Sequence, residues 1–425
     1  MIKYRCIRWQ RGHWIIFQTC MLICILISTG IVRGQEISPI QPHNIKWSPD
    51  GRQIAVGYQN GQVNIYNTLD SSTILSIEAH NALASTLAWS PDGNLLATGG
   101  GFPDNSLRVW NVTTGEMVYE YLDLGVDILA IVWKPDGTQI VASAAEPFNR
   151  QHSDIVVERN TWQESPIRLG AVSDIAWSPD LTEIVITRIS DIRLIDATSF
   201  EMLNQYVLPS TETNLQYQPV GVIWHPDGGS FAVAMGNGRV SLYEVGNLDP
   251  IFTFVANEYA GDDRFIGWVH ALHFDASGQT LTGMSGDGVI RTWNVQTETL
   301  VAEQVGNLNY AADFSPYGAQ IALGIAPETS EITIGSSDTM VVIRTLAGGT
   351  VQIVVPAPSL ERLQAIAEAC NAPTTIEQSL TANIQADRLA EFVAEVESLP
   401  DDMIPPACRV DLLAVAEALQ TLEQE

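Results

Sequence analysis

Short segments in which apolar and polar residues alternate recur along most of this chain. Residues 80–121 contain four such segments, separated by three turns. Alternation with a period of two residues is typical of β-strands that bury one face. The first turn is Pro91-Asp92-Gly93, in which proline presets φ, aspartate caps its own backbone and glycine takes a positive φ. The stretch therefore predicts one antiparallel unit of four strands.

The same unit recurs seven times between residues 43 and 345. Each copy has an aromatic residue at the end of its first strand, followed by a turn. The aromatic residues are Trp47, Trp89, Trp133, Trp177, Trp224, Phe274 and Phe314. Their spacing is 42 to 44 residues in the first half, then 47, 50 and 40. A period in the low forties with four strands per unit predicts an all-β, seven-bladed β-propeller, because blades packed around a ring bury both faces of each sheet.

These repeats resemble those of the WD-repeat family. The second copy ends its third strand at Trp110-Asn111, where the family usually has Trp-Asp. The resemblance implies a propeller over residues 35–355 that presents a rigid face to other proteins. It also implies that His80, Thr98, Asp104 and Trp110 form a buried hydrogen-bond network inside one blade, although a hydroxyl, a histidine and an aspartate could be mistaken for a nucleophilic triad.

Two repeats depart from the pattern. Leu181 stands where the turn of repeat 4 should have glycine, so a different turn is expected there. Repeat 7 has a weak third strand ending at Ile334-Gly335, and residues 339–345 are expected to complete it. Residues 349–355 form an extra strand that is available to latch the ring.

The period changes from 2 to 3.6 after Pro356, which predicts a helical C-terminal domain over residues 356–425. Three helical regions are expected, the second stopped by Pro400 and the third opened by Pro405-Pro406. Both a self-standing bundle and a cap docked on the propeller fit this pattern. A bundle this small needs a staple, which the Cys370–Cys408 pair is placed to supply as a disulfide.

Residues 1–34 have the composition of a signal peptide. Five basic residues and no acidic ones accompany a mostly apolar run over residues 14–32, and Val32-Arg33-Gly34 offers a cleavage site. The alternative is an uncleaved anchor, since 19 residues nearly span a bilayer. Both readings predict export of residues 35–425, to the extracellular space, the periplasm or the outer face of the cytoplasmic membrane. Membrane contact is expected only through such an anchor.

The charge of the chain limits the classes of partner. The formal net charge is −28, and the part after the leader carries 16 basic and 49 acidic residues, a net of −33. Such a surface repels nucleic acid and anionic lipid headgroups, so neither is expected as a partner. An acidic surface that serves only solubility is the alternative account.

Motifs for chemistry are lacking in the sequence. We find no glycine-rich phosphate loop, no His-x-x-x-His metal pair and no Gly-x-Ser-x-Gly elbow, so no metal, cofactor or catalytic residue is expected. The sequence favours a non-enzymatic protein-interaction scaffold with an unidentified protein partner. An extracytoplasmic enzyme, or a propeller that binds a carbohydrate or another ligand, is the alternative, because a fold does not fix a function.

The longest loops predict where a protein partner binds. The turn between the second and third strands of a blade and the connection into the next blade lie on the same face, and the extra residues of repeats 3 to 6 fall in these segments. Aromatic residues and arginine are enriched at interface hot spots. The predicted partner-binding residues are Phe148, Arg150, His152, Tyr217, Tyr259, Asp262, Asp263, Arg264, Phe265 and Trp268. The alternative is that insertions accumulated in surface loops, with some aromatic side chains packed into blade seams.

Overall fold

The computed structural model places residues Ile40–Glu425 in one compact unit. The described residues are 41–122, 124, 127–145, 152–165, 169–170, 172–188, 191–208, 219–247, 249–256, 269–305, 309–325, 340–346, 351–356, 358, 360–370, 373–385, 388–400 and 403–422. The predicted signal peptide lies outside them. Within these ranges, no helix is long and apolar enough to cross a membrane.

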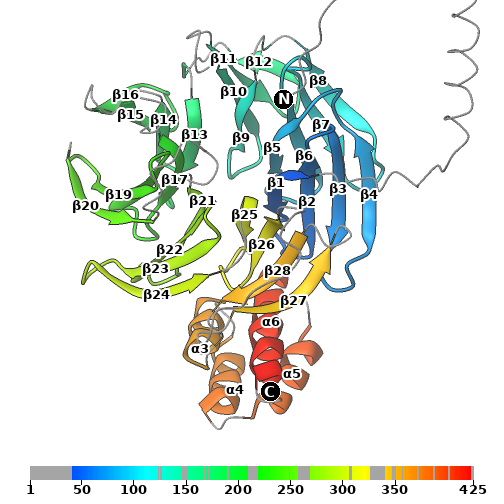
Figure 1. Ribbon diagram of the computed structural model, residues 1–425, viewed down its shortest axis with the longest axis vertical. Helices are drawn as coiled ribbons and strands as arrows, with labels where there is room; N and C mark the ends of the chain where they lie inside the picture. The colour runs from blue at the N-terminus through cyan, green and yellow to red at the C-terminus, as the bar shows by residue number, and fades with distance from the viewer. Residues whose placement is uncertain are drawn as a thin grey trace, which may run out of the picture. The chain divides into compact units, whose positions relative to one another are not determined.

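Seven antiparallel sheets of four strands form a β-propeller, which confirms the predicted fold (Figure 1). Blades 1 and 2 comprise β1 (Pro42–Trp47), β2 (Gln53–Tyr58), β3 (Gln62–Asn67), β4 (Thr73–Glu78), β5 (Ala84–Trp89), β6 (Leu95–Gly100), β7 (Leu107–Asn111) and β8 (Met117–Tyr121). Blades 3 and 4 comprise β9 (Ile128–Trp133), β10 (Gln139–Ala145), β11 (His152–Glu158), β12 (Gln163–Ser165), β13 (Val172–Trp177), β14 (Glu183–Arg188), β15 (Asp191–Asp196) and β16 (Met202–Val207). Blades 5 and 6 comprise β17 (Pro219–Trp224), β18 (Ser230–Met235), β19 (Arg239–Glu244), β20 (Pro250–Val255), β21 (Val269–Phe274), β22 (Thr280–Ser285), β23 (Val289–Asn294) and β24 (Thr299–Val305). Blade 7 comprises β25 (Asn309–Phe314), β26 (Ile321–Ile325), β27 (Met340–Leu346) and β28 (Val351–Pro356).

Indole groups join neighbouring blades at the inner ends of the seams. Trp89 Nε1 donates a hydrogen bond to the carbonyl oxygen of Lys46 at 3.0 Å, and Trp133 Nε1 donates to that of Ala88 at 3.1 Å. In each case the acceptor precedes the aromatic residue of the previous blade. The first strands line the centre of the ring, where each contacts the first strands of two neighbours. The repeated aromatic residue therefore fixes the spacing between blades.

The Ser-Pro-Asp-Gly turn closes its hairpin with side-chain hydrogen bonds. Ser48 Oγ donates to Asp50 Oδ1 at 2.6 Å and accepts from Gln53 N at 2.9 Å, while Gly51 takes φ 69°. The turn of blade 4 has the same bonds around Ser178, with Leu181 at φ 62° in the place of glycine. The expectation of a different turn there was wrong, because the serine and aspartate bonds hold leucine in the left-handed conformation.

Blade 7 does not follow the order of the chain. Its strands are ordered β25-β26-β28-β27, so β28 pairs with β26 and β27 forms the outer edge. The outer strand is where residues 339–345 were predicted. The third strand is β28, so the assignment of that position to Ile334-Gly335 was wrong, and Ile334-Gly335 itself lies outside the described residues.

The ring closes where β1 meets β25. Asp313 accepts hydrogen bonds from Trp47 N at 2.9 Å and from Lys46 Nζ at 3.0 Å, and Trp47 Nε1 donates to the Asp313 carbonyl oxygen at 3.2 Å. Both partners at this seam belong to first strands. The latch thus lies at the centre of the ring, and β28 is an ordinary member of blade 7 rather than an added latch.

In the described part of the chain after β28, four helices gather beside blade 7 (Figure 1). They are α3 (Leu360–Ala369), α4 (Thr374–Gln385), α5 (Leu389–Ser398) and α6 (Pro406–Leu422). The second of the three predicted helical regions is thus two helices, and Pro406 opens α6 as expected. Their core is continuous with blade 7, since the buried residues Ala319 and Val355 belong to the same apolar cluster. The domain is therefore a cap docked on the propeller and not a separate bundle.

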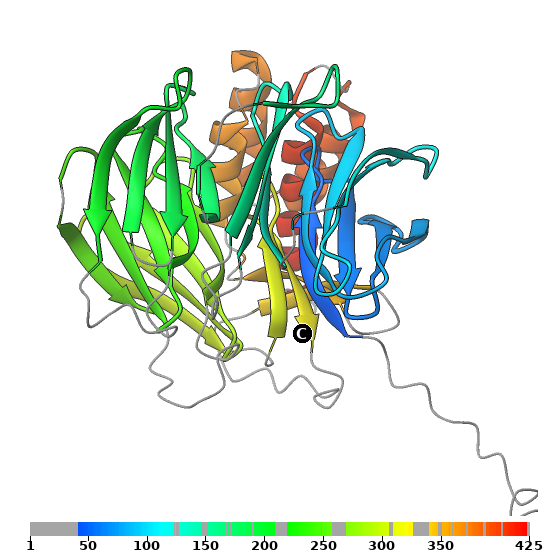
Figure 2. The same cartoon turned by 90° about the horizontal axis from the view of Figure 1, so that it is seen from above.

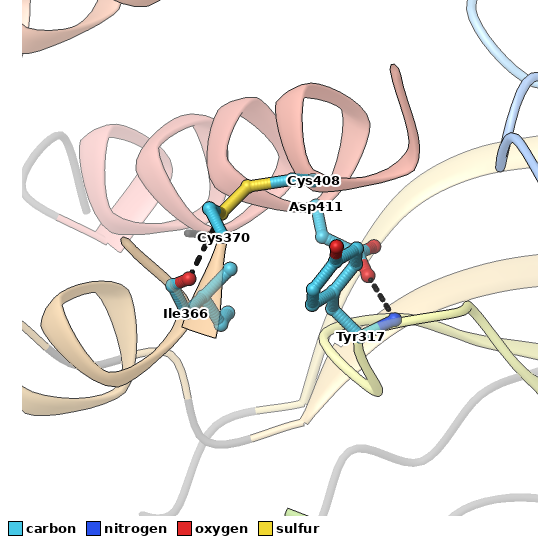
Figure 3. The surroundings of a disulfide bond; sticks show 5 residues. All are labelled: Tyr317, Ile366, Cys370, Cys408 and Asp411. Atoms are coloured by element: carbon cyan, nitrogen blue, oxygen red, sulfur yellow. Dashed lines mark hydrogen bonds between the residues drawn. A yellow bond between two sulfur atoms is a disulfide. The ribbon is translucent and has the colours of Figure 1, made fainter. Parts of the chain in front are cut away.

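A buried carboxylate of α6 joins this cap to the turn of blade 7. Repeat 7 has Ser315-Pro-Tyr317-Gly318, with tyrosine in the place of the turn aspartate. Asp411 supplies the missing carboxylate: it accepts from Ser315 Oγ at 2.9 Å and from Gln320 Nε2 at 2.8 Å. It also accepts from Tyr317 N at 3.0 Å (Figure 3). Asp411 is fully buried, and this burial raises its pKa despite the three hydrogen bonds.

Further contacts tie the cap to the same end of the ring. Arg362 of α3 donates to the carbonyl oxygen of Gly318 at 2.6 Å. At blade 1, a Cβ added to Gly51 would lie 3.3 Å from the Cα of Ala407, so the turn and α6 are in close contact. Figure 2 shows the helices toward one end of the strands. The cap therefore contacts the turns of blades 7 and 1, on both sides of the closing seam.

We expect Leu181→Gly to stabilise the protein by about 0.5 to 1 kcal/mol. Glycine removes the steric cost of a positive φ, and this gain exceeds the extra conformational entropy that glycine loses on folding. Leu181 is 42% exposed, so little apolar burial is lost. The matched variant is Gly93→Ala in blade 2, where φ is 69° and an added Cβ meets nothing within 4 Å. It should lose about 1 kcal/mol. Urea unfolding measures the free energy of unfolding of both variants. A Leu181→Gly variant that is less stable than the wild type would contradict the account of this turn.

We expect Asp411→Ala to cost about 3 kcal/mol or more, because three buried donors lose their acceptor. Tyr317→Asp should also destabilise, since it places a second carboxylate against Asp411. The double variant restores one carboxylate at the turn. It should therefore be more stable than the sum of the single effects by at least about 1 kcal/mol. Additive effects in a urea-unfolding cycle would show that Asp411 does not replace the turn aspartate.

Candidate functional site

The predicted partner-binding residues are almost entirely outside the described part of the chain. The exception is His152, whose backbone begins β11 and pairs with Ala145 of β10. The others are Phe148, Arg150, Tyr217, Tyr259, Asp262, Asp263, Arg264, Phe265 and Trp268. The structure therefore neither brings them together nor separates them, and the predicted surface stays a prediction.

The four network residues of blade 2 lie within hydrogen-bond distance of one another. His80 Nδ1 is 2.9 Å from Asp104 Oδ1, His80 Nε2 is 2.8 Å from Thr98 Oγ1, and Trp110 Nε1 donates to the same Thr98 oxygen at 3.0 Å. His80 and Thr98 are buried at 5% and 0% exposure. The network joins strands inside a blade, away from any substrate, which suits a structural role.

Charge in this network is balanced by a residue that the sequence analysis missed. Arg108 of β7 lies 3.1 Å from Asp104 Oδ2. Burial acts to raise the pKa of Asp104, but hydrogen bonds from Asn81, Ser106 and His80 outweigh it, and the pKa falls well below its usual range. Burial lowers the pKa of His80. A neutral imidazole between an ionised carboxylate and a hydroxyl is therefore the stable state.

An axial cavity of about 600 Å³ lies between the first strands. Among the residues that the structure describes, three charged side chains line it: Lys46 on β1, Asp313 on β25 and Asp174 on β13. The charge of Asp313 raises the pKa of Lys46 above its usual value. Burial raises the pKa of Asp174, and hydrogen bonds from Val222 N and Ile175 N oppose this shift. The sequence analysis did not single out these three positions.

Two exposed apolar side chains lie at the end of the ring that carries the turns between second and third strands. Phe102, in the β6–β7 turn, is 75% exposed, and Leu122, in the connection from β8 to β9, is 63% exposed. Phe102 N donates to Asp127 Oδ1 in that same connection. In the sequence, Phe102 is an aromatic residue in the segment Gly100-Gly101-Phe102-Pro103. This segment was not among the long loops on which the predicted partner-binding surface was based.

Neither the axial cavity nor the exposed end of blade 2 is a catalytic arrangement by itself. Among the described residues, no three histidine, cysteine or acidic side chains are grouped so as to hold a metal ion. The cavity offers carboxylates, an ammonium and an amide for binding. The exposed end of blade 2 offers an aromatic side chain for contact with a macromolecule.

The comparisons with known proteins point to WD-repeat proteins. The family model for eukaryotic translation initiation factor eIF2A matches residues 31–125. WD repeat-containing protein slp1 of Schizosaccharomyces pombe is 32% identical over 124 residues, which are 28% of this chain and 25% of that protein. APC/C activator protein CDH1 of Saccharomyces cerevisiae is 34% identical over 100 residues, 23% of this chain and 18% of that protein. THO complex subunit 3 of Arabidopsis thaliana is 24% identical over 262 residues, 60% of this chain and 76% of that protein.

The match to slp1 spans about a quarter of that relative's length. The longer match to THO complex subunit 3 covers several repeats at lower identity. Together with the seven four-stranded sheets, these similarities support a WD-repeat β-propeller with seven blades.

Proposed function

We propose that this protein is an exported, non-enzymatic scaffold that binds a protein partner through the propeller end opposite the helical cap. The observation that carries the proposal is the exposure of Phe102, a large aromatic side chain held on a rigid ring at that end. Burying such a side chain stabilises an interface strongly, and aromatic residues are enriched at interface cores.

The position of the cap supports this choice of end. In an antiparallel blade, the first and third turns lie at one end, and the second turn lies at the other end with the connection to the next blade. The cap contacts the first turns of blades 1 and 7 through Gly51 and Ser315. Phe102 lies in a second turn and so belongs to the other end. A partner there would meet no helix of the cap.

The names of the relatives support a scaffold over an enzyme. CDH1 is named as an activator of the APC/C, and THO complex subunit 3 is named as a subunit of a complex. We infer from these relatives that this chain also binds a protein partner. Its export is a separate inference, which rests on the composition of residues 1–34.

We expect a photo-crosslinking residue at Phe102 to trap a protein partner in cells that make the native protein. The matched control is the same residue at Leu181, which is also exposed but lies in a first turn, at the opposite end. We expect crosslinks at position 102 and none at position 181. The crosslinks at position 102 should be lost when Tyr259, Arg264 and Phe265 are all changed to alanine. Equal labelling at both positions, or labelling only at 181, would contradict the proposed end.

Export also predicts that Cys370 and Cys408 are oxidised. The two residues are a pair at disulfide distance, with their Cα atoms 5.8 Å apart (Figure 3). Protein taken directly into acid, alkylated without reductant and digested should yield the two cysteine peptides linked. The bond should stabilise the cap by about 4 kcal/mol. The control Cys408→Ser frees Cys370 for alkylation. Complete alkylation of both cysteines in the wild-type protein would argue against export and against the bridge.

A further inference from the structure

The first turn of blade 7 lies between a histidine of blade 6 and an arginine of the cap. His273 on β21 stacks its imidazole on the ring of Phe314, with the ring centroids 5.4 Å apart. A Cβ added to Gly318 would lie 2.1 Å from His273 Nε2, so the imidazole also packs directly against the backbone of this glycine. Arg362 of α3 donates from Nη2 to the carbonyl oxygen of the same glycine at 2.6 Å. Both side chains therefore contact Gly318, where the ring meets the cap.

The neighbouring seam has a similar imidazole with a different set of hydrogen bonds. His225, in the first turn of blade 5, packs against the turn glycine of blade 6, since a Cβ added to Gly278 would lie 2.1 Å from its Nε2. This Nε2 is 3.0 Å from the carbonyl oxygen of Gly278, and Nδ1 is 2.7 Å from Asp227 Oδ1. An imidazolium at this position would therefore have an acceptor for each of its two N–H groups.

His273 lacks such acceptors in the described part of the chain. The carbonyl oxygen of Gly318 already accepts from Arg362, and none of the hydrogen bonds among the described residues is made by His273. A second proton on this ring would add a cation beside the guanidinium, without an acceptor for its N–H. Burial, followed by the charge of Arg362, lowers the pKa of His273 to about 4, and the charge of Asp275 opposes this shift. The neutral ring is therefore the state that fits the docked cap.

Two further ionisable groups adjoin the turn. Asp411 of α6 accepts hydrogen bonds from the turn and interacts with the charge of Arg362. Burial raises the pKa of Asp411, so proton uptake by this carboxyl group favours the docked state, which is opposite in sign to the effect of His273. Burial also raises the pKa of Tyr317, which keeps this phenol neutral in acid. A variant of His273 therefore isolates the part of the pH response that opposes docking.

We propose that the contact between the cap and blade 7 is acid-sensitive, and that protonation of His273 weakens the hold of Arg362 on the turn and releases the cap. Release would expose the apolar core that the cap shares with blade 7, which includes Leu363 and Val355. This response belongs to the end of the ring opposite Phe102 and does not depend on the proposed partner.

The direction of the response follows from the two states of the imidazole. In the released state His273 has the ordinary histidine pKa of 6.5, and in the docked state its pKa is about 4. Docking is therefore unaffected by His273 above pH 6.5 and loses stability as the pH falls from 6.5 toward 4. Each unit of this pKa difference corresponds to a tenfold change in the docking equilibrium, so release through His273 should rise on the order of tenfold by about pH 5.

Hydrogen exchange of the full chain at about pH 7.5 and about pH 5, corrected for intrinsic exchange rates, tests the proposal. Peptides from α3 and α6 report release of the cap, and peptides from β6 and β7 report unfolding of the ring. Exchange in the cap should rise on the order of tenfold at the lower pH, while β6 and β7 stay protected. His273→Gln should abolish this rise, because an amide does not take up a proton. The matched control His225→Gln, in the seam between blades 5 and 6, should retain it.

An NMR titration of the wild-type histidine rings keeps the test decisive if His273→Gln does not fold. His273 should remain neutral to well below pH 6.5, because the docked cap opposes its protonation. The proposal is overturned if exchange in the cap does not rise at the lower pH, or if it rises equally in His273→Gln and in the wild type. Titration of His273 near pH 6.5 would overturn it as well.

Discussion

The fold depends on a carboxylate that comes from outside its own repeat. In blades 1 and 2, an aspartate two residues after the turn serine closes the first hairpin locally. In blade 7, Asp411 performs this role from α6, 96 residues beyond Ser315. Because Asp411 is fully buried, separating the cap from the propeller would leave charged and polar groups unpaired. This carboxylate and the apolar core that the cap shares with blade 7 therefore join the two parts.

Local chemistry made most of the fold predictable. Period-two alternation and the aromatic-turn repeat specify strands and hairpins from neighbouring residues, and these agree with the structure in six blades. One error was local: Leu181 adopts the glycine conformation because the neighbouring Ser178 and Asp180 hold the turn. The other error arose where a distant strand decides. The order of β27 and β28 depends on pairing with β26, and hydrophobic pattern does not distinguish a third strand from a fourth.

The candidate sites were less predictable for the same reason. The blade 2 network could be anticipated because its four positions follow one repeat, but Arg108, which neutralises Asp104, had no signal of its own. Lys46, Asp174 and Asp313 come from three different blades and line one cavity only when the ring closes. Single polar residues in apolar inner strands were the available signal, and their juxtaposition required the structure.

Two buried carboxylates of this structure lie in different surroundings. Asp411 accepts hydrogen bonds from three donors of blade 7, so its hydrogen-bonding capacity serves the contact between the cap and the ring. Asp174 accepts from two backbone N–H groups and lines the axial cavity. Burial raises the pKa of both groups, so a pKa shift alone does not separate their roles. What separates them is their surroundings: Asp411 is fully buried against blade 7, whereas Asp174 lies on the wall of the axial cavity.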